Sequence, residues 1–168
     1  MIKIALFAGG TIDSFQMDFD LFIGVDRGSL FLIEQGICPD LAVGDFDSVS
    51  EKELALIYSQ SKEVLQAQPE KDDTDLELAV KAVFARYPKA QLTIFGAFGG
   101  RLDHTLANIF LPSNPEITPY MQQIRLCNAQ NQLCYCPQGR HEVKPVAGMN
   151  YLAFMPADNS RLSIEGAK

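Results

Sequence analysis

Short apolar runs alternate with helical segments along the first two-thirds of the chain, and this alternation is the strongest constraint on its fold. The runs that we expect to form strands are residues 2–7, 21–25, 41–43, 63–67 and 91–95. Between them lie helix signals, such as the capping-box pattern from Ser50 to Glu53 and the 3.6-residue apolar period from Leu76 to Phe84. Strands that alternate with helices through short links predict an α/β fold with a mainly parallel sheet.

Polar residues gather where the predicted strands end and the next helices begin. These clusters are Gly9 and Gly10; Asp26 and Arg27; Asp45 and Asp47; Lys71, Asp72 and Asp75; and Arg101 and Asp103. In parallel sheets, ligands bind beyond the carboxyl ends of the strands, near a switch in strand order. The shared position of the clusters therefore predicts one binding site at that edge.

The clearest cluster is Gly44-Asp45-Phe46-Asp47-Ser48, which directly follows the apolar run at residues 41–43. Two carboxylates one residue apart on a strand can point the same way because strand side chains alternate with period 2. Such a pair repels itself unless a cation or a proton lies between the two groups. Mg²⁺ prefers oxygen ligands of this kind and completes its shell with water and phosphates. The motif favours a magnesium–nucleotide site over a simple Asp turn.

The segment Lys71-Asp72-Asp73-Thr74-Asp75 opens a predicted helix. In one interpretation it is only a helix start, with Asp72 as N-cap and Asp75 three residues later, where the helix dipole favours acidic groups. In the other, its crowded charges need a positive partner, which Lys71 or a metal ion would supply. The sequence leaves both open.

The segment from Gly99 to Asn108 combines a glycine pair with charged residues. Gly99, Gly100 and Arg101 fit a loop that brings a guanidinium group onto phosphate oxygens. Asp103 is the expected N-cap of a helix that runs to about residue 110. His104 is either structural or catalytic, and Asn108, one turn later, shares its side of that helix.

The charge of the chain is unevenly distributed. Residues 1–112 carry 17 Asp and Glu against 9 Lys and Arg, whereas residues 113–168 carry 4 against 5. An acidic surface argues against nucleic-acid binding, which needs a basic face. There is no apolar run near the roughly 18 residues of a membrane-spanning helix and no signal-peptide pattern, so we expect a cytoplasmic protein without a membrane partner.

The character of the sequence changes at Pro112, Pro115 and Pro119, which mark residues 113–119 as a linker. Before the linker, residues 1–112 form the expected α/β nucleotide-binding domain. After it, strands are expected at 124–127, 132–136, 150–155 and 161–164, in a small all-β unit of residues 120–168. A unit with so few strands has a marginal core, and we therefore expect it to pack against another subunit or to be incomplete.

Together, four segments resemble the thiamine pyrophosphokinase family in residue identity, order and spacing. They are Asp26-Arg27-Gly28, Gly44-Asp45-Phe46-Asp47-Ser48, Lys71-Asp72-x-Thr74-Asp75 and Gly99-Gly100-Arg101-x-Asp103-His104-x-x-x-Asn108. The resemblance implies Mg²⁺-dependent transfer of pyrophosphate from ATP to the hydroxyl of thiamine, giving thiamine diphosphate and AMP. It also implies a Rossmann-like catalytic domain, a homodimer with thiamine near the subunit interface, and a β-sandwich thiamine-binding domain that begins in residues 120–168.

The resemblance also assigns roles to individual residues. The implied metal ligands are Asp45, Asp47 and Asp75, and the implied catalytic acidic cleft adds Asp72 and Asp103. The implied substrate-binding residues are Asp26, Gly28, Ser48, Lys71, Thr74, Arg101, His104 and Asn108. One aspartate would accept the hydroxyl proton of thiamine, but the resemblance does not say which.

Two features depart from the family pattern. Arg27 stands where the family more often has glycine. Family members continue beyond the last residue of this sequence with further strands and a Ser-Asn motif of the thiamine pocket, so we expect a truncated form of the β-sandwich.

Two other functions compete with the kinase. A Mg²⁺-dependent phosphohydrolase would use Asp45 as its nucleophile, although such enzymes usually carry their Asp pair after the first strand and here it follows the third. A non-catalytic module that binds a nucleotide or thiamine is the second alternative.

Overall fold

The computed structural model describes residues 1–68, 72–159 and 161–166. Its strands are β1 (Lys3–Phe7), β2 (Leu21–Val25), β3 (Leu41–Gly44), β4 (Val64–Gln66), β5 (Gln91–Phe95), β6 (Ile124–Cys127) and β7 (Gln132–Cys134). Its α-helices are α1 (Arg27–Glu34), α2 (Glu51–Gln60), α3 (Asp75–Arg86) and α4 (Leu102–Ile109), and two 3₁₀ helices are η1 (Leu111–Ser113) and η2 (Thr118–Gln123).

The strands form one 7-stranded sheet in the order β4-β3-β2-β1-β5-β6-β7. All neighbouring strands pair in parallel except β6 and β7, which are antiparallel. The predicted α/β class and the mainly parallel sheet are therefore confirmed. The chain runs outward from β1 to β4 and then returns to β5 on the other side of β1, which places the switch in strand order between β1 and β5.

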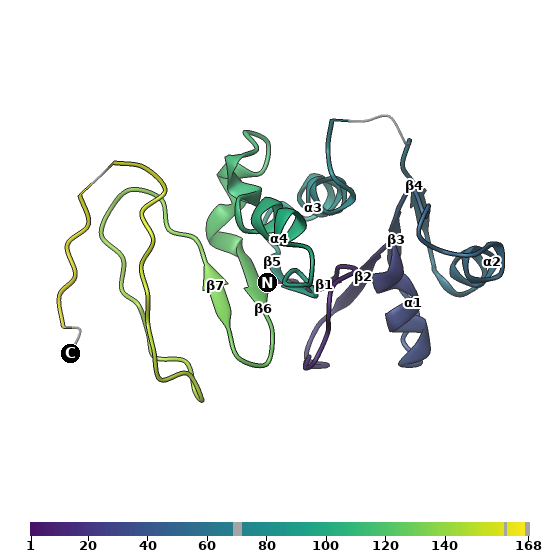
Figure 1. Ribbon diagram of the computed structural model, residues 1–168, viewed down its shortest axis with the longest axis horizontal. Coiled ribbons are helices and arrows are strands. Elements are labelled where there is room, and N and C mark those ends of the chain that lie inside the picture. Colours follow the sequence, from purple (N-terminus) through teal and green to yellow (C-terminus); the bar gives the residue numbers. More distant parts are fainter. Residues whose placement is uncertain (69–71, 160, 167–168) are drawn as a thin grey trace.

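Helices cover both faces of the sheet, with α3 and α1 on opposite sides (Figure 1). Because strand side chains alternate, Ile4 and Leu6 of β1 join the large apolar cluster that includes the buried face of α3. Ala5 and Phe7 of the same strand join the opposite cluster, together with Leu32 of α1. The period-2 and period-3.6 patterns of the sequence thus correspond to the two faces of one core.

The connection from β1 to β2 is a loop that carries aromatic side chains in place of a helix. Phe15 of this loop lies edge-on to Phe7 at a centroid distance of 5.3 Å, and Phe7 also stacks on Phe95 at 5.2 Å. Phe19 of the same loop packs edge-on against Phe95 at 5.9 Å. These rings bury the sheet face beside α1 without a crossover helix.

Residues 113–119, predicted as a linker, lie in a packed segment instead. Leu111 and Ile117 are 2% and 1% exposed and belong to the main core. Pro112 and Pro119 stand in the first turns of η1 and η2, where no backbone N–H is needed for the helix. The prolines start short helices here, and so their presence does not mark a boundary in the fold.

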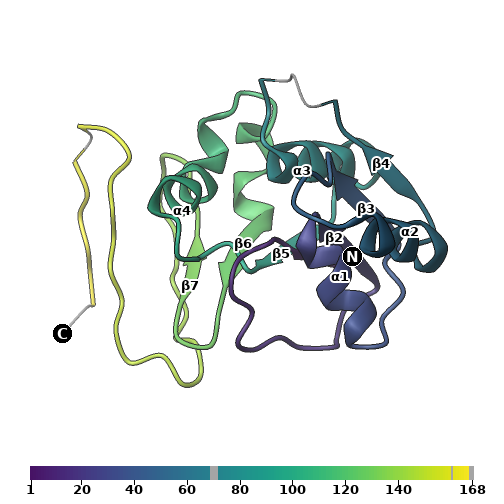
Figure 2. The ribbon, with the colours of Figure 1, turned by 45° about the vertical axis from the view of Figure 1, so that its right-hand side comes forward.

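The strands expected at the start of an all-β unit belong to the main sheet. Leu126 of β6 is fully buried in the large cluster, next to β5. Residues 150–155 and 161–164, predicted as strands, form none, and the side chains of Tyr151 and Met155 are 97% and 83% exposed. After β7 the chain runs as extended segments along one side of the body (Figures 1 and 2).

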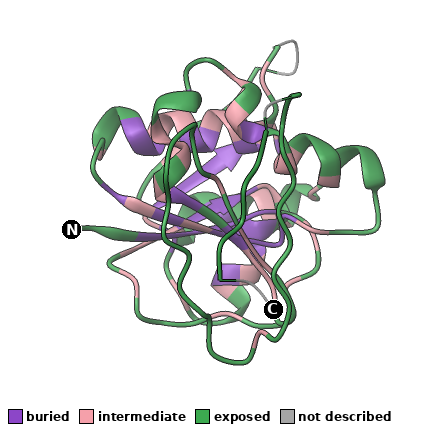
Figure 3. Cartoon of the chain, turned by 90° about the vertical axis from the view of Figure 1, so that its left-hand side faces the viewer, coloured by how far each residue is buried: buried purple, intermediate pink, exposed green. Residues whose placement is uncertain are grey.

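The burial of residues also differs between the sheet and the segments after β7 (Figure 3). The buried residues lie in the sheet and on the helix faces that touch it, whereas the extended segments after β7 are exposed. A β-sandwich is not confirmed, because the apolar side chains of these segments have no second layer to pack against within the part of the chain that the structure describes. Within the described ranges, none of the helices has both the length and the apolar character to cross a membrane.

Candidate active site

Three aspartates from separate parts of the sequence meet at the carboxyl edge of the sheet. Asp26 follows β2, Asp45 follows β3, and Asp75 is the first residue of α3. Each offers one carboxylate oxygen, and the three oxygens lie within 4.8 Å of one another. β2 and β3 are parallel neighbours, so the residues after them emerge side by side. We call Asp26, Asp45 and Asp75 the carboxylate group; all three are half-buried.

The backbone around the carboxylate group is strained. Asp26 has φ 48° and Phe46 has φ 58°, and they are the two described non-glycine residues with positive φ. Hydrogen bonds hold both: Asp26 N–H donates to the carbonyl of Val43 at 2.9 Å, and Phe46 N–H donates to Asp26 Oδ1 at 3.3 Å. The Phe46 side chain is buried in the apolar cluster that includes Leu30 and Ile57, which anchors the turn in the core. Strain of this kind is typical of functional sites, where the surroundings over-determine the geometry.

Two glycines of the sequence motifs are explained by close packing. A Cβ on Gly44 would lie 1.9 Å from Asp26 Oδ1, so a side chain at Gly44 would displace a member of the carboxylate group. A Cβ on Gly28 would lie 1.9 Å from the carbonyl oxygen of Phe7, where α1 begins against β1. Gly28, predicted to bind substrate, is buried at this contact.

The pKa of Asp26 is raised to about 7. Burial is the largest cause, followed by the negative charges of Asp75 and Asp45, and the hydrogen bond from Phe46 N–H opposes them only in part. Carboxylates this close become stable together when a proton or a cation lies between them. Carboxylate oxygens are hard donors of the kind that Mg²⁺ prefers, so the group has the donor chemistry of a divalent-cation site.

Asp47 and Ser48 lie beside the carboxylate group and outside it. β3 ends at Gly44, so residues 45–48 form a turn and the period-2 reasoning for Asp45 and Asp47 does not apply. Asp47 N–H donates to Asp45 Oδ1 at 3.1 Å, and both Asp47 and Ser48 are exposed. The Ser48 carbonyl accepts a hydrogen bond from Arg27 Nη1 at 3.2 Å, which ties the turn to the start of α1.

The acidic segment before α3 begins the helix differently from the prediction. Thr74 is the N-cap, and its side chain and that of Glu77 form a reciprocal capping box. The N-cap predicted at Asp72 is wrong, because only Thr74 has a glutamate three residues later. Asp72 is exposed, and Lys71 lies outside the described residues.

The loop after β5 carries a charged pair at the surface. Arg101 Nε donates to Asp103 Oδ1 at 3.2 Å, and both side chains are more than half exposed. The Arg101 guanidinium lowers the pKa of Asp103 to about 2. Arg101 holds the N-cap position without a capping bond and Asp103 lies in the first turn of α4, so the N-cap predicted at Asp103 is wrong.

Of the remaining predicted residues of α4, one is exposed at the surface and one makes a structural hydrogen bond. His104 is exposed. Asn108 Nδ2 donates to the carbonyl of Ala97 at 2.8 Å, and Thr105 Oγ1 accepts from the N–H of Gly99 at 3.2 Å. These bonds attach α4 to the loop after β5, which gives Asn108 a structural contact.

Sequence reasoning placed Asp26 near substrates and missed its place in the carboxylate group. The available signal was its position at the end of the strand next to β3, a neighbour relation that needs the strand order. A separate pocket is lined in part by Gly9, Arg27, Phe31 and Glu34, and no member of the carboxylate group lines it. Phe31 and Glu34 stand one turn apart on α1 and carry no motif that would have identified them.

The family model and the curated relative that match this chain carry the same family description. Residues 12–126 match the family described as "Thiamin pyrophosphokinase, catalytic domain". Thiamine pyrophosphokinase of Bacillus subtilis is 35% identical over 176 residues, which cover 100% of this chain and 81% of the relative.

Solved structures agree with this placement. A thiamin pyrophosphokinase family protein of Enterococcus faecalis is 42% identical with a TM-score of 0.78, and the match covers 82% of this chain and 66% of that one. Thiamin pyrophosphokinase of Candida albicans shares the fold, with 15% identity, a TM-score of 0.60 and coverage of 74% and 56%. This chain thus spans less than two-thirds of these solved relatives.

Proposed function

The chain belongs to the thiamine pyrophosphokinase family, and from that premise we propose that it transfers a pyrophosphoryl group from ATP to the hydroxyl of thiamine. The products are thiamine diphosphate and AMP. The observation that carries the proposal is the carboxylate group at the edge of the sheet, since such transfer depends on positioning and on neutralising phosphate charge.

Asp26, Asp45 and Asp75 are the residues that would hold Mg²⁺. Their oxygens are hard donors that lie within 4.8 Å of one another. Burial is the main cause of the raised pKa of Asp26, and the negative charges of Asp75 and Asp45, which a cation would offset, raise it further. Asp47 stays a proposed ligand because it lies two residues after Asp45 and its N–H donates to Asp45 Oδ1 at 3.1 Å. When bound, Mg²⁺ would polarise the phosphoryl oxygens of ATP.

The other predicted residues are proposed to bind the substrates around this group. Arg101 would exchange its contact with Asp103 for ATP phosphate oxygens, since both side chains are at the surface. The remaining proposed contacts come from Ser48, Lys71, Asp72, Thr74, His104 and Asn108. One aspartate of the site would accept the proton of the thiamine hydroxyl.

We also propose a cytoplasmic homodimer with thiamine near the subunit interface, in which residues after β7 begin a β-sandwich thiamine-binding domain. Exposed apolar side chains support association of subunits: Leu102 on α4 is 70% exposed, and Tyr151 after β7 is 97% exposed. Surfaces of this kind are stabilised by association. Light scattering after gel filtration should give about twice the 18.6 kDa chain mass.

Formation of AMP from ATP tests the proposed reaction. Purified protein with Mg²⁺ and ATP should form AMP and thiamine diphosphate only when thiamine is added. Asp45→Asn, which keeps the shape of the side chain and removes its charge, should abolish the product.

Two further measurements separate the alternatives. Release of inorganic phosphate from phosphate esters, without an acceptor, would indicate a phosphohydrolase. Stabilisation against heat by thiamine or ATP without turnover would indicate a binding module.

A further inference from the structure

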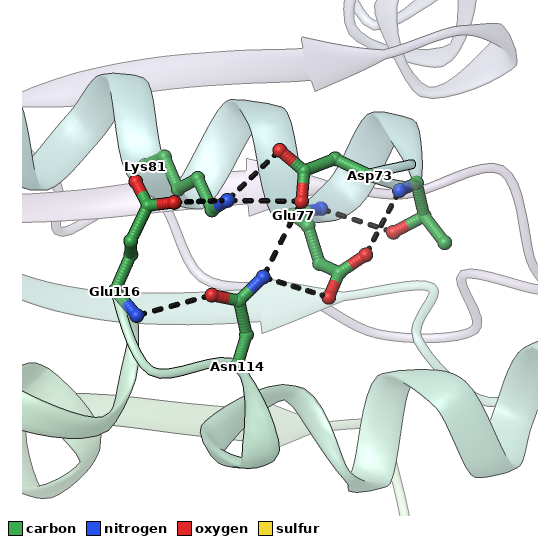
Figure 4. Close-up of polar contacts among 6 residues, drawn as sticks. Asp73, Glu77, Lys81, Asn114 and Glu116 are labelled. Carbon is green, nitrogen blue, oxygen red and sulfur yellow. Dashed lines mark hydrogen bonds and ion pairs between the residues drawn. The ribbon is translucent and has the colours of Figure 1, made fainter. Parts of the chain in front are cut away.

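The side chain of Asn114 lies between two acidic residues that flank Asp75 (Figure 4). Its Nδ2 donates to Asp73 Oδ1 at 3.3 Å and to Glu77 Oε1 at 3.2 Å. Its Oδ1 accepts from the N–H of Glu116 at 3.1 Å. Both donor hydrogens and the acceptor of this amide are therefore used, and 2 of the 3 bonds reach the start of α3.

Lys81 completes the same network from the next turns of α3. Its Nζ donates to both oxygens of Asp73, at 2.9 and 2.8 Å, and to Glu116 Oε1 at 3.0 Å. The side chains of Lys81 and Asp73 are only 19% and 26% exposed, so this ion pair is shielded from solvent more than a surface pair. Lys81 thereby offsets part of the acidic charge that crowds the start of the helix.

The segment that carries Asn114 is itself anchored in the core. Ile117 is 1% exposed, and the ring of Tyr120 stacks on Phe84 of α3 at a centroid distance of 4.3 Å. The carbonyl of Asn114 accepts from the N–H groups of Ile117 and Thr118, both at 2.9 Å. Asn114 therefore holds α3 from a rigid support.

We propose that Asn114 is a positioning residue, which fixes Asp75 in the carboxylate group by holding Asp73 and Glu77 on either side of it. Asp75 stands two residues from each of them, and Glu77 also closes the capping box with Thr74. This inference rests on the proposed function, in which Asp75 is a ligand of the divalent cation. Partners that orient a metal ligand typically change metal affinity about 10- to 100-fold when they are removed.

Asn114→Asp is the sharpest test, because it keeps the size of the side chain. The new carboxylate still accepts from Glu116 N–H but cannot donate, and it repels Asp73 and Glu77. Asp73→Asn combined with Asn114→Asp restores a donor between positions 73 and 114 and keeps the total charge. Asn114→Ala removes the two bonds without adding a charge, in case the first variant does not fold.

The readout is Mn²⁺ binding to the full chain, measured by the loss of the free-ion electron paramagnetic resonance signal, because Mn²⁺ takes the same oxygen ligands as Mg²⁺. Asn114→Ala and Asn114→Asp should each weaken binding about tenfold or more. The double variant should recover only part of this loss, because it restores the bond between positions 73 and 114 but keeps the repulsion of Glu77 and removes the ion pair of Lys81 with Asp73. Turnover should show a higher KM for Mg²⁺ with a smaller change in kcat.

A control variant on the same helix separates positioning from stability. Arg86→Gln breaks the ion pair between Arg86 Nη2 and Glu63 Oε1, 2.6 Å long, at the far end of α3. It should lower the melting temperature and leave Mn²⁺ affinity unchanged.

Unchanged Mn²⁺ affinity in folded Asn114→Asp or Asn114→Ala would overturn the inference. So would equal Mn²⁺ binding by the original protein and Asp75→Asn, because Asp75 would then not be a ligand. If Mn²⁺ binding depends on Asp75 and Asn114 but no AMP forms, the positioning role stands and the proposed reaction fails.

Discussion

The two sides of the candidate site differ in how firmly the protein holds them. On the side of β2, β3 and α3, the carboxylate group is half-buried, its backbone is strained, and hydrogen bonds fix the turn around it. On the side of β5 and α4, Arg101 and Asp103 are exposed and pair with each other. The first side holds its negative charges in fixed positions, whereas the charges of the second side neutralise each other at the surface.

This difference suggests a division of labour. Groups held in place before the ligand arrives lose little entropy on binding and can stabilise developing charge. An exposed pair of long side chains contributes little to stability in any fixed geometry, so rearranging it costs little. We therefore expect substitutions on the two sides to have different signatures in activity, stability and metal binding.

The largest difference should appear in activity. Asp75→Asn removes a charge from the carboxylate group and should lower kcat about a thousandfold, because metal stabilisation of a phosphoryl transfer amounts to several kcal/mol. Asp103→Asn should raise the KM for ATP or thiamine with a smaller change in kcat. Steady-state kinetics of AMP formation checks both, and equal losses in kcat would remove the distinction between the two sides.

The next effect concerns the packing of Gly44 against Asp26. Gly44→Ala would place its Cβ 1.9 Å from Asp26 Oδ1, so we expect a loss of about 1–3 kcal/mol in the free energy of unfolding. Gly9→Ala is the control, because its Cβ would meet no atom within 4 Å. Chemical denaturation measures both, and equal stability of the two variants would contradict the tight fit at Gly44.

The smallest effect is the pH dependence that comes from Asp26. Its pKa rises from 3.8 to about 7 on folding, so the folded chain holds more protons between these values and this group makes the metal-free protein less stable as pH rises from 4 to 7. Asp26→Asn should remove this dependence and raise the melting temperature at pH 8 by about 4 °C. Melting curves at pH 5 and pH 8 test this, and Mg²⁺ should reduce the difference in the original protein.

The regular part of the fold could be predicted because each local pattern agrees with its tertiary role. Leu76, Val80 and Val83 repeat at the helical period and are buried on α3, and the run at β1 alternates between two apolar clusters. The capping box at Ser50 and Glu53 is confirmed as the start of α2. In these cases propensity and packing favour the same structure.

The site could be predicted only in part because its members meet through the strand order. Asp45 and Asp75 are in the carboxylate group, while Asp26 joins them only because β2 lies beside β3. The positive φ of Phe46 ends the extended backbone before Asp47, so Asp45 and Asp47 do not have the side-chain alternation of a strand. No sequence pattern predicts this φ value. Asn114 lies in a proline-rich stretch that predicted a linker, and its contacts with α3 depend on the burial of Ile117.

Binding of Mn²⁺ to the metal-free protein tests most directly whether Asp26, Asp45 and Asp75 act as one site. Isothermal titration should give one tight site in the original protein and in Asp103→Asn, and a loss of about tenfold or more in affinity in Asp26→Asn, Asp45→Asn and Asp75→Asn. Tight binding that survives in the latter three variants, or that disappears in Asp103→Asn, would contradict the central claim.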